Sequence, residues 1–185
     1  SAVLRHGQHR SGKLALLEDL LSTILAEGEK ALIFTQYKEF GEYLSDYVRK
    51  RFGVPAPFLH GSLRREERDA MVDSFQSPDG PPIMVLSLKA GGTGLTLTAA
   101  NHVIHYDRWW NPAVENQATD RAYRIGQTKD VQVRKLVCDG TIEERIDDII
   151  SHKSTMSDLV VSTGETWLTE LDDEQLQELF RLEVT

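Results

Sequence analysis

Ala31-Leu-Ile-Phe-Thr35 is a short apolar run of strand-forming residues that lies between two segments of helical spacing. Before it, leucines and isoleucines recur every three or four residues between Ser11, a suitable N-cap, and Gly28, a suitable stop. After it, residues 37–51 again carry apolar side chains at helical spacing. A buried strand between two amphipathic helices is typical of an α/β fold, in which helices cover a mainly parallel sheet.

The same alternation continues along the chain. Residues 55–60, 83–86, 102–106 and 131–137 predict four further strands, and residues 64–76 predict a charged helix with Met71, Val72 and Phe75 on its apolar face. Beyond Gly140 the pattern is helical only. The sequence therefore predicts a three-layer α/β domain over residues 1–140 and a helical extension over residues 141–185.

Charge is distributed unevenly between these two parts. The formal net charge of the 185 residues is −8, but residues 141–185 hold twelve acidic and only three basic side chains. Residues 1–140 are close to neutral, so the acidic total does not exclude a nucleic-acid partner. No apolar run reaches membrane-spanning length, which argues against a membrane. The single cysteine, Cys138, cannot form an internal disulfide and fits the cytosol or a nucleus.

Two arginines occupy a segment that reads as one helix. Asn111 can cap it, and Gly126 suits the position just past its end. Gln117, Arg121 and Arg124 then fall within an arc of roughly 60°. Guanidinium groups match phosphate oxygens in a bidentate way, and they can stabilise charge on a transferring phosphoryl group. An exposed helix with two solvated arginines fits the spacing equally well.

Small and polar residues follow three of the predicted strands. The loop 87–95 carries three glycines and Lys89, so its backbone N–H groups could hold phosphate oxygens. Thr35 and Gln36, and the run His60-Gly61-Ser62, could donate hydrogen bonds to a nucleic-acid backbone. Loops at the carboxyl ends of parallel strands are where α/β folds bind ligands. The alternatives are a tight strand–helix connection for the first loop and helix capping for the other two.

Other motifs are weaker. Arg10-Ser-Gly-Lys13 lacks the earlier glycine and the following Ser or Thr of a Walker A loop, and no acidic pair for Mg²⁺ follows a strand. His102 and His105 are three apart on a strand, so they should point to opposite faces, and no metal site is expected. Trp109 and Trp110 cannot both point inward from one extended segment, so one of them should meet a partner.

Together these segments closely resemble the carboxy-terminal RecA-like lobe of the Swi/Snf-type ATPases of helicase superfamily two. The resemblance covers nearly the whole chain in the family's order. It is carried by Lys30-Ala-Leu-Ile-Phe-Thr-Gln-Tyr37, His60-Gly-Ser-Leu63 with Arg68, residues 87–97, Tyr106-Asp-Arg-Trp-Trp-Asn-Pro112, Gln117-Ala-Thr-Asp-Arg-Ala-Tyr-Arg-Ile-Gly-Gln127 and Gly140-Thr-Ile-Glu-Glu-Arg145. The Arg-Trp-Trp-Asn-Pro variant is similar to prokaryotic and archaeal members.

The resemblance implies the second motor lobe of an ATP-dependent translocase or remodeller of double-stranded DNA. ATP and Mg²⁺ would be held mainly by a first RecA-like lobe that these residues do not include, so the chain alone should not hydrolyse ATP. Arg121 and Arg124 would be arginine fingers, with Gln117 and Gly94 also at the nucleotide. The residues along the DNA side would be Thr35, Gln36, His60, Gly61, Ser62, Lys89, Gly91, Gly92 and Trp110.

The resemblance also implies partners and a location. The extension 141–185 would pack back toward the first lobe, and another DNA-bound protein could be what is remodelled. A prokaryotic protein of this kind would act at the cytoplasmic nucleoid, and a eukaryotic one in the nucleus. Two other classes remain open. One is an interaction module that uses the acidic extension, and the other is a small-molecule enzyme, for which no dinucleotide turn or nucleophile–base pair is evident.

Overall fold

The computed structural model describes residues 12–87, 97–107, 120 and 130–137. Within these residues the chain forms three helices and five strands. The helices are α1 (Gly12–Ala26), α2 (Lys38–Phe52) and α3 (Arg65–Gln76). The strands are β1 (Ala31–Thr35), β2 (Phe58–Leu59), β3 (Ile83–Ser87), β4 (His102–His105) and β5 (Gln132–Lys135).

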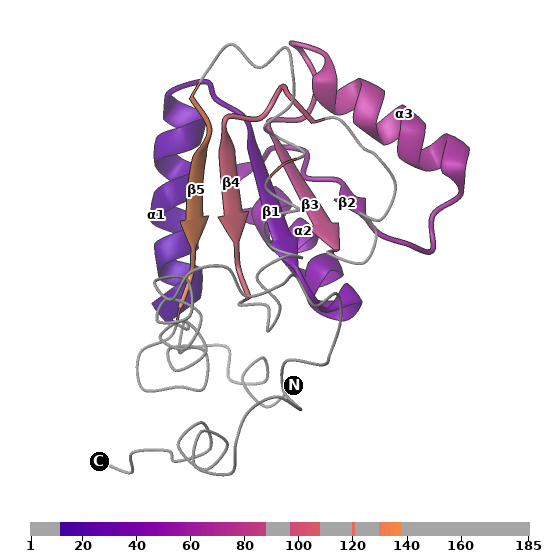
Figure 1. Ribbon diagram of the computed structural model, residues 1–185. Coiled ribbons are helices and arrows are strands. Elements are labelled where there is room, and N and C mark those ends of the chain that lie inside the picture. The colour runs from indigo at the N-terminus through magenta and orange to yellow at the C-terminus, as the bar shows by residue number, and fades with distance from the viewer. Residues whose placement is uncertain (1–11, 88–96, 108–119, 121–129, 138–185) are drawn as a thin grey trace, which may run out of the picture.

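The described strands form one sheet in the order β2-β3-β1-β4-β5. Every adjacent pair is parallel. The strand arrows in Figure 1 accordingly all run toward the same, lower edge of the sheet. The carboxyl ends of the strands, and the residues that follow them, therefore share one edge. We call this the carboxyl edge and the opposite one the amino edge.

Helices cover both faces of the sheet, as Figure 1 shows. On one face, Ile33, Val85 and Ile104 pack with apolar side chains of α1 and α2. On the other, Phe34 and Met84 pack with side chains that include Phe75 of α3. Neighbouring residues of β1 thus belong to different cores because side chains alternate along a strand. The arrangement is the predicted three-layer α/β fold.

Local sequence explains how several elements end and pack. Gly28 and Gly53 have φ values of 67° and 68°, the left-handed conformation that glycine adopts without a steric penalty, and they follow α1 and α2. Gly41 lets α2 approach the sheet, because a Cβ there would overlap the ring of Phe58. α3 begins after Arg64, whose backbone N–H donates to the Glu67 carboxylate at 2.9 Å.

Three strands are shorter than the sequence predicts. The second spans only Phe58–Leu59 instead of residues 55–60, because Pro55 and Pro57 have no N–H for the ladder. The Pro57 carbonyl still accepts from Val85 N–H at 2.9 Å. The fourth ends at His105 rather than 106, and the fifth covers Gln132–Lys135 rather than 131–137.

The arginine helix, the glycine-rich loop and the extension 141–185 lie outside the described residues. None of the described helices has the length and apolar character needed to cross a membrane.

Candidate functional site

The strand register lines up the ends of the three strands that precede the predicted DNA-side loops. Leu59 pairs with Leu86, and Thr35 pairs with Ser87. His60, Ser87 and Thr35 are therefore level with one another on three adjacent strands. With strands spaced by about 4.8 Å, the backbones of His60 and Thr35 are roughly 10 Å apart. That spacing allows one extended ligand, such as a nucleic-acid backbone, to span both loops.

Thr35 and Gln36 are tied to the end of β4 by Asp107. The Thr35 hydroxyl donates to Asp107 Oδ2 at 2.5 Å, and the Gln36 backbone N–H donates to the same oxygen at 3.1 Å. The Tyr37 N–H donates in turn to Thr35 Oγ1 at 3.4 Å. Thr35 is fully buried, and Gln36 is half-buried. The expected DNA contact of Thr35 stays a prediction, and its hydroxyl hydrogen is used within the protein.

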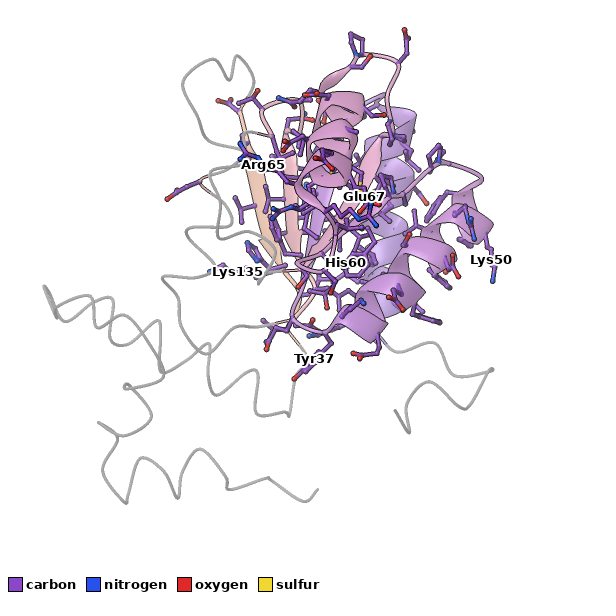
Figure 2. All side chains as sticks on the ribbon, turned by 90° about the vertical axis from the view of Figure 1, so that its right-hand side faces the viewer. Tyr37, Lys50, His60, Arg65, Glu67 and Lys135 are labelled. Carbon is purple, nitrogen blue, oxygen red and sulfur yellow. The ribbon has the colours of Figure 1, made fainter. Side chains whose placement is uncertain are left out.

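The other predicted loop residues of this edge are more accessible. His60 is half-buried, its ring centroid lies 5.0 Å from that of Phe58, and its buried Nδ1 has no hydrogen-bond partner among the described residues. Gly61 and Ser62 are exposed. Tyr37, which was not among the predicted site residues, is 61% exposed at this edge. Figure 2 shows Tyr37 at the lower margin of the described structure, with His60 above it.

Sequence reasoning assigned no role to Asp107 and Tyr37. Both lie inside motifs that were identified, directly before Arg108-Trp-Trp and directly after Thr35-Gln36. A carboxylate just past a strand end was the available signal for Asp107. What the sequence could not show was its partner, which is 72 residues away along the chain.

Lys13 does not act as a P-loop lysine. It lies in the first turn of α1 and is 8% exposed. Its ammonium donates to the Tyr106 carbonyl at 2.9 Å and lies 5.6 Å from the centre of that ring. Lys13 therefore fixes α1 against the end of β4, which agrees with the rejection of a Walker A motif.

At the amino edge, one cluster has the residue types of a cation site. Ligand atoms of Glu27, Glu29 and His102 lie within 4.8 Å of one another. However, His102 Nε2 forms a short hydrogen bond with Glu29, and its Nδ1 faces the Arg134 guanidinium at 2.9 Å. Since arginine can only donate, Nδ1 is the acceptor and the Nε2 hydrogen points at Glu29. The cluster is an internal Arg–His–Glu chain, and the adjacent positive charge of Arg134 disfavours a metal ion. His105 does not join it, because its ring stacks on Phe34.

The nucleotide-facing part of the predicted site lies outside the described residues. It comprises the predicted fingers Arg121 and Arg124, then Gln117 and Gly94. The predicted DNA-side residues Lys89, Gly91, Gly92 and Trp110 lie there too. Among the described residues, the structure brings Thr35, Gln36, His60, Gly61 and Ser62 to one edge.

Comparisons with known proteins identify the class to which this fold and edge belong. Residues 12–126 match the model of the helicase conserved C-terminal domain, so the chain belongs to that family. The isolated SWI2/SNF2 ATPase C-terminal domain of Sulfolobus solfataricus is 40% identical, with a TM-score of 0.76 over 99% of this chain and 75% of that one. The chain is thus homologous to the C-terminal RecA-like lobe of the Swi2/Snf2 ATPases.

Particular relatives are similar over almost all of the chain. The putative ATP-dependent helicase/translocase YwqA of Bacillus subtilis is 55% identical over 95% of this chain. The Sulfolobus solfataricus SWI2/SNF2 ATPase core in complex with dsDNA is 44% identical over 95% of it, with a TM-score of 0.78. The chain spans only 19% of YwqA and 36% of that core.

Proposed function

We propose that this chain is the second motor lobe of an ATP-dependent translocase or remodeller that acts on double-stranded DNA. The observation that carries the proposal is the 44% identity, over 95% of the chain, to a SWI2/SNF2 core described in complex with dsDNA. The carboxyl edge supports it, because the described residues of two loops, Gln36 after β1 and His60 to Ser62 after β2, bring polar groups to the place where α/β folds bind ligands.

Arg121 and Arg124 would serve as arginine fingers, with Gln117 and Gly94 also facing the nucleotide. Guanidinium groups stabilise the negative charge that spreads over the transferring phosphoryl group, and they remain charged at any physiological pH. Mg²⁺ and most of the phosphate contacts would belong to a first RecA-like lobe. Closure of the two lobes on ATP would bring the fingers to the phosphates, and hydrolysis would release them.

The DNA side would run along the carboxyl edge through Gln36, His60, Gly61 and Ser62, with Thr35 beneath them. Lys89, Gly91, Gly92 and Trp110 would extend it. Amide, hydroxyl and backbone N–H donors suit phosphate oxygens, which are the same at every base pair. Little sequence specificity and a strong dependence on salt are therefore expected.

The test is ATP hydrolysis by the full-length protein with and without double-stranded DNA. Arg121→Ala and Arg124→Ala should each lower kcat by about 10³-fold or more, which is the usual scale for an arginine finger. Arg49→Ala is the matched control, because Arg49 is exposed on α2 and its ion pair among the described residues is with Asp46, one turn away on the same helix. The 185-residue chain alone should show no turnover.

Three results would count against the proposal. Unchanged kcat in both Arg121→Ala and Arg124→Ala would contradict their assignment as arginine fingers. ATP hydrolysis by the full-length protein that does not respond to DNA would contradict the translocase, and a full-length protein without any ATP hydrolysis would favour an interaction module.

A further inference from the structure

Asp107 lies where the chain leaves β4, and it joins that point to the loop after β1. Two donors from the loop, the Thr35 hydroxyl and the Gln36 N–H, share its Oδ2 atom. The neighbouring Tyr106 N–H donates to the Phe34 carbonyl at 3.0 Å, which continues the β1–β4 pairing up to this position. Beyond the last backbone hydrogen bond between β1 and β4, the Asp107 side chain therefore continues the connection between the two strands.

The network also gives the loop its shape. α2 starts directly after the loop, and its N-cap residue, Tyr37, makes no side-chain capping hydrogen bond to the described residues. Instead, the Tyr37 N–H donates to Thr35 Oγ1, whose own hydrogen is given to Asp107. A hydrogen bond to a carboxylate is about twice as strong as one between neutral groups. The chain Asp107–Thr35–Tyr37 thus performs the ordering role that a capping side chain would otherwise have.

A direct contact between Asp107 and DNA is disfavoured. Its carboxylate is half-buried, and both it and a phosphate accept hydrogen bonds without being able to donate them. Its effect must pass through the two groups that it holds.

We propose that Asp107 is a positioning residue for DNA engagement, which holds residues 35–37 in the shape that presents Gln36 to the DNA. The same carboxylate ties this loop to the chain that continues from β4 toward Arg121 and Arg124. The inference rests on the proposed function and adds to it a residue that touches neither ligand.

The experiment measures, for the full-length protein, kcat and the DNA concentration that gives half-maximal stimulation of ATP hydrolysis. The variants are Asp107→Ala, Thr35→Val, which removes the hydroxyl at nearly constant shape, and the two together. Asp46→Ala is the control, because it deletes an exposed carboxylate that accepts from Arg49 at 2.7 Å on α2. Amide hydrogen exchange at Gln36 reports on the loop without relying on activity.

Each single variant should raise the half-maximal DNA concentration about tenfold, equivalent to about 1.4 kcal/mol, and leave kcat at saturating DNA within about twofold. The double variant should show less than the product of the two single effects, since both single variants delete the Thr35–Asp107 hydrogen bond. The Gln36 amide should exchange faster in Asp107→Ala, and Asp46→Ala should behave as the unmodified protein.

Several outcomes would overturn the role. Unaltered DNA dependence in both single variants would do so, as would effects that multiply in the double variant. A lower kcat at an unchanged half-maximal DNA concentration would indicate only a loss of folded protein. If the unmodified protein is not stimulated by DNA, the proposed function fails and this inference falls with it. If DNA stimulates ATP hydrolysis by the unmodified protein and the variants respond to DNA in the same way, only the role of Asp107 is contradicted.

Discussion

At the amino edge of the sheet, polar side chains are used for internal hydrogen bonds, whereas at the carboxyl edge several of them face outward. The Lys30 ammonium donates to the carbonyls of Phe75, Ser77 and Gly80 at 2.8, 2.5 and 3.4 Å. His102 is 2% exposed between Glu29 and Arg134. At the carboxyl edge, Gly61, Ser62 and Tyr37 are exposed. The polar groups of the amino edge thus stabilise the fold, whereas those exposed at the carboxyl edge are accessible to a ligand.

The difference shows why residue type alone is a poor guide to function here. Lysine, histidine and carboxylates gather at the amino edge, yet they hold α3 and the sheet together. The carboxyl edge offers mainly amide, hydroxyl and backbone groups, which suit phosphate oxygens. Substitutions at the amino edge should therefore lower stability, and substitutions at the carboxyl edge should lower DNA engagement.

The largest effect on stability is expected for His102→Ala. It deletes the middle of the Arg134–His102–Glu29 chain and leaves a carboxylate and a guanidinium facing a cavity. The free energy of unfolding should fall by about 3 kcal/mol, because two hydrogen bonds between the imidazole and charged partners are lost, each contributing roughly 1.5 kcal/mol or more. Urea unfolding measures this change.

Glu27→Gln is the control for that variant, because Glu27 is an exposed neighbour of the same cluster. It should change the free energy of unfolding by less than about 0.5 kcal/mol. If His102→Ala changed the free energy of unfolding as little as Glu27→Gln, the cluster would not be stabilising. The view that polar residues of the amino edge serve stability would then be wrong.

A smaller effect is expected for Ser62→Ala at the carboxyl edge, and it should fall on DNA binding instead of on stability. Loss of one hydrogen bond to a DNA phosphate should weaken DNA binding by the full-length protein by about two- to tenfold. The stability should change by less than about 0.5 kcal/mol, since Ser62 is exposed. Ser22→Ala is the matched control, because Ser22 lies on α1 and its hydroxyl donates to the Glu18 carbonyl of the same helix. Equal DNA affinities for the two variants would contradict the DNA-side assignment.

Much of the fold was predictable from the sequence because burial leaves a strong local pattern. The apolar run at β1 predicted its exact bounds, since both of its faces are buried. The start of β4 was also predicted, whereas the ends of β2 and β5 were not. Strand ends depend on which backbone groups find partners, and those partners come from distant parts of the chain.

The site was predictable in part, for a related reason. The alternation of strands and helices placed Thr35 and His60 at one edge without further information. It could not show that β3 lies between them, because strand order is set by tertiary packing. It also could not show that the Thr35 hydroxyl serves Asp107, a contact between residues that no local pattern connects.

The smallest expected effect is a pH dependence at the amino edge. Burial lowers the pKa of the Lys30 ammonium below its ordinary value of 10.5, and Asp79 partly opposes this. The unfolded chain therefore binds the Lys30 proton more tightly than the folded chain does. As pH rises from the lowered pKa toward 10.5, this disadvantage of the folded state is relieved, so the free energy of unfolding should increase relative to Lys30→Met. Urea unfolding of both proteins between neutral and alkaline pH measures that difference. If the stability of the unmodified protein relative to Lys30→Met instead fell with rising pH, the three carbonyls would favour the charged ammonium more than burial disfavours it. Lys30 would then stabilise the amino edge through its charge.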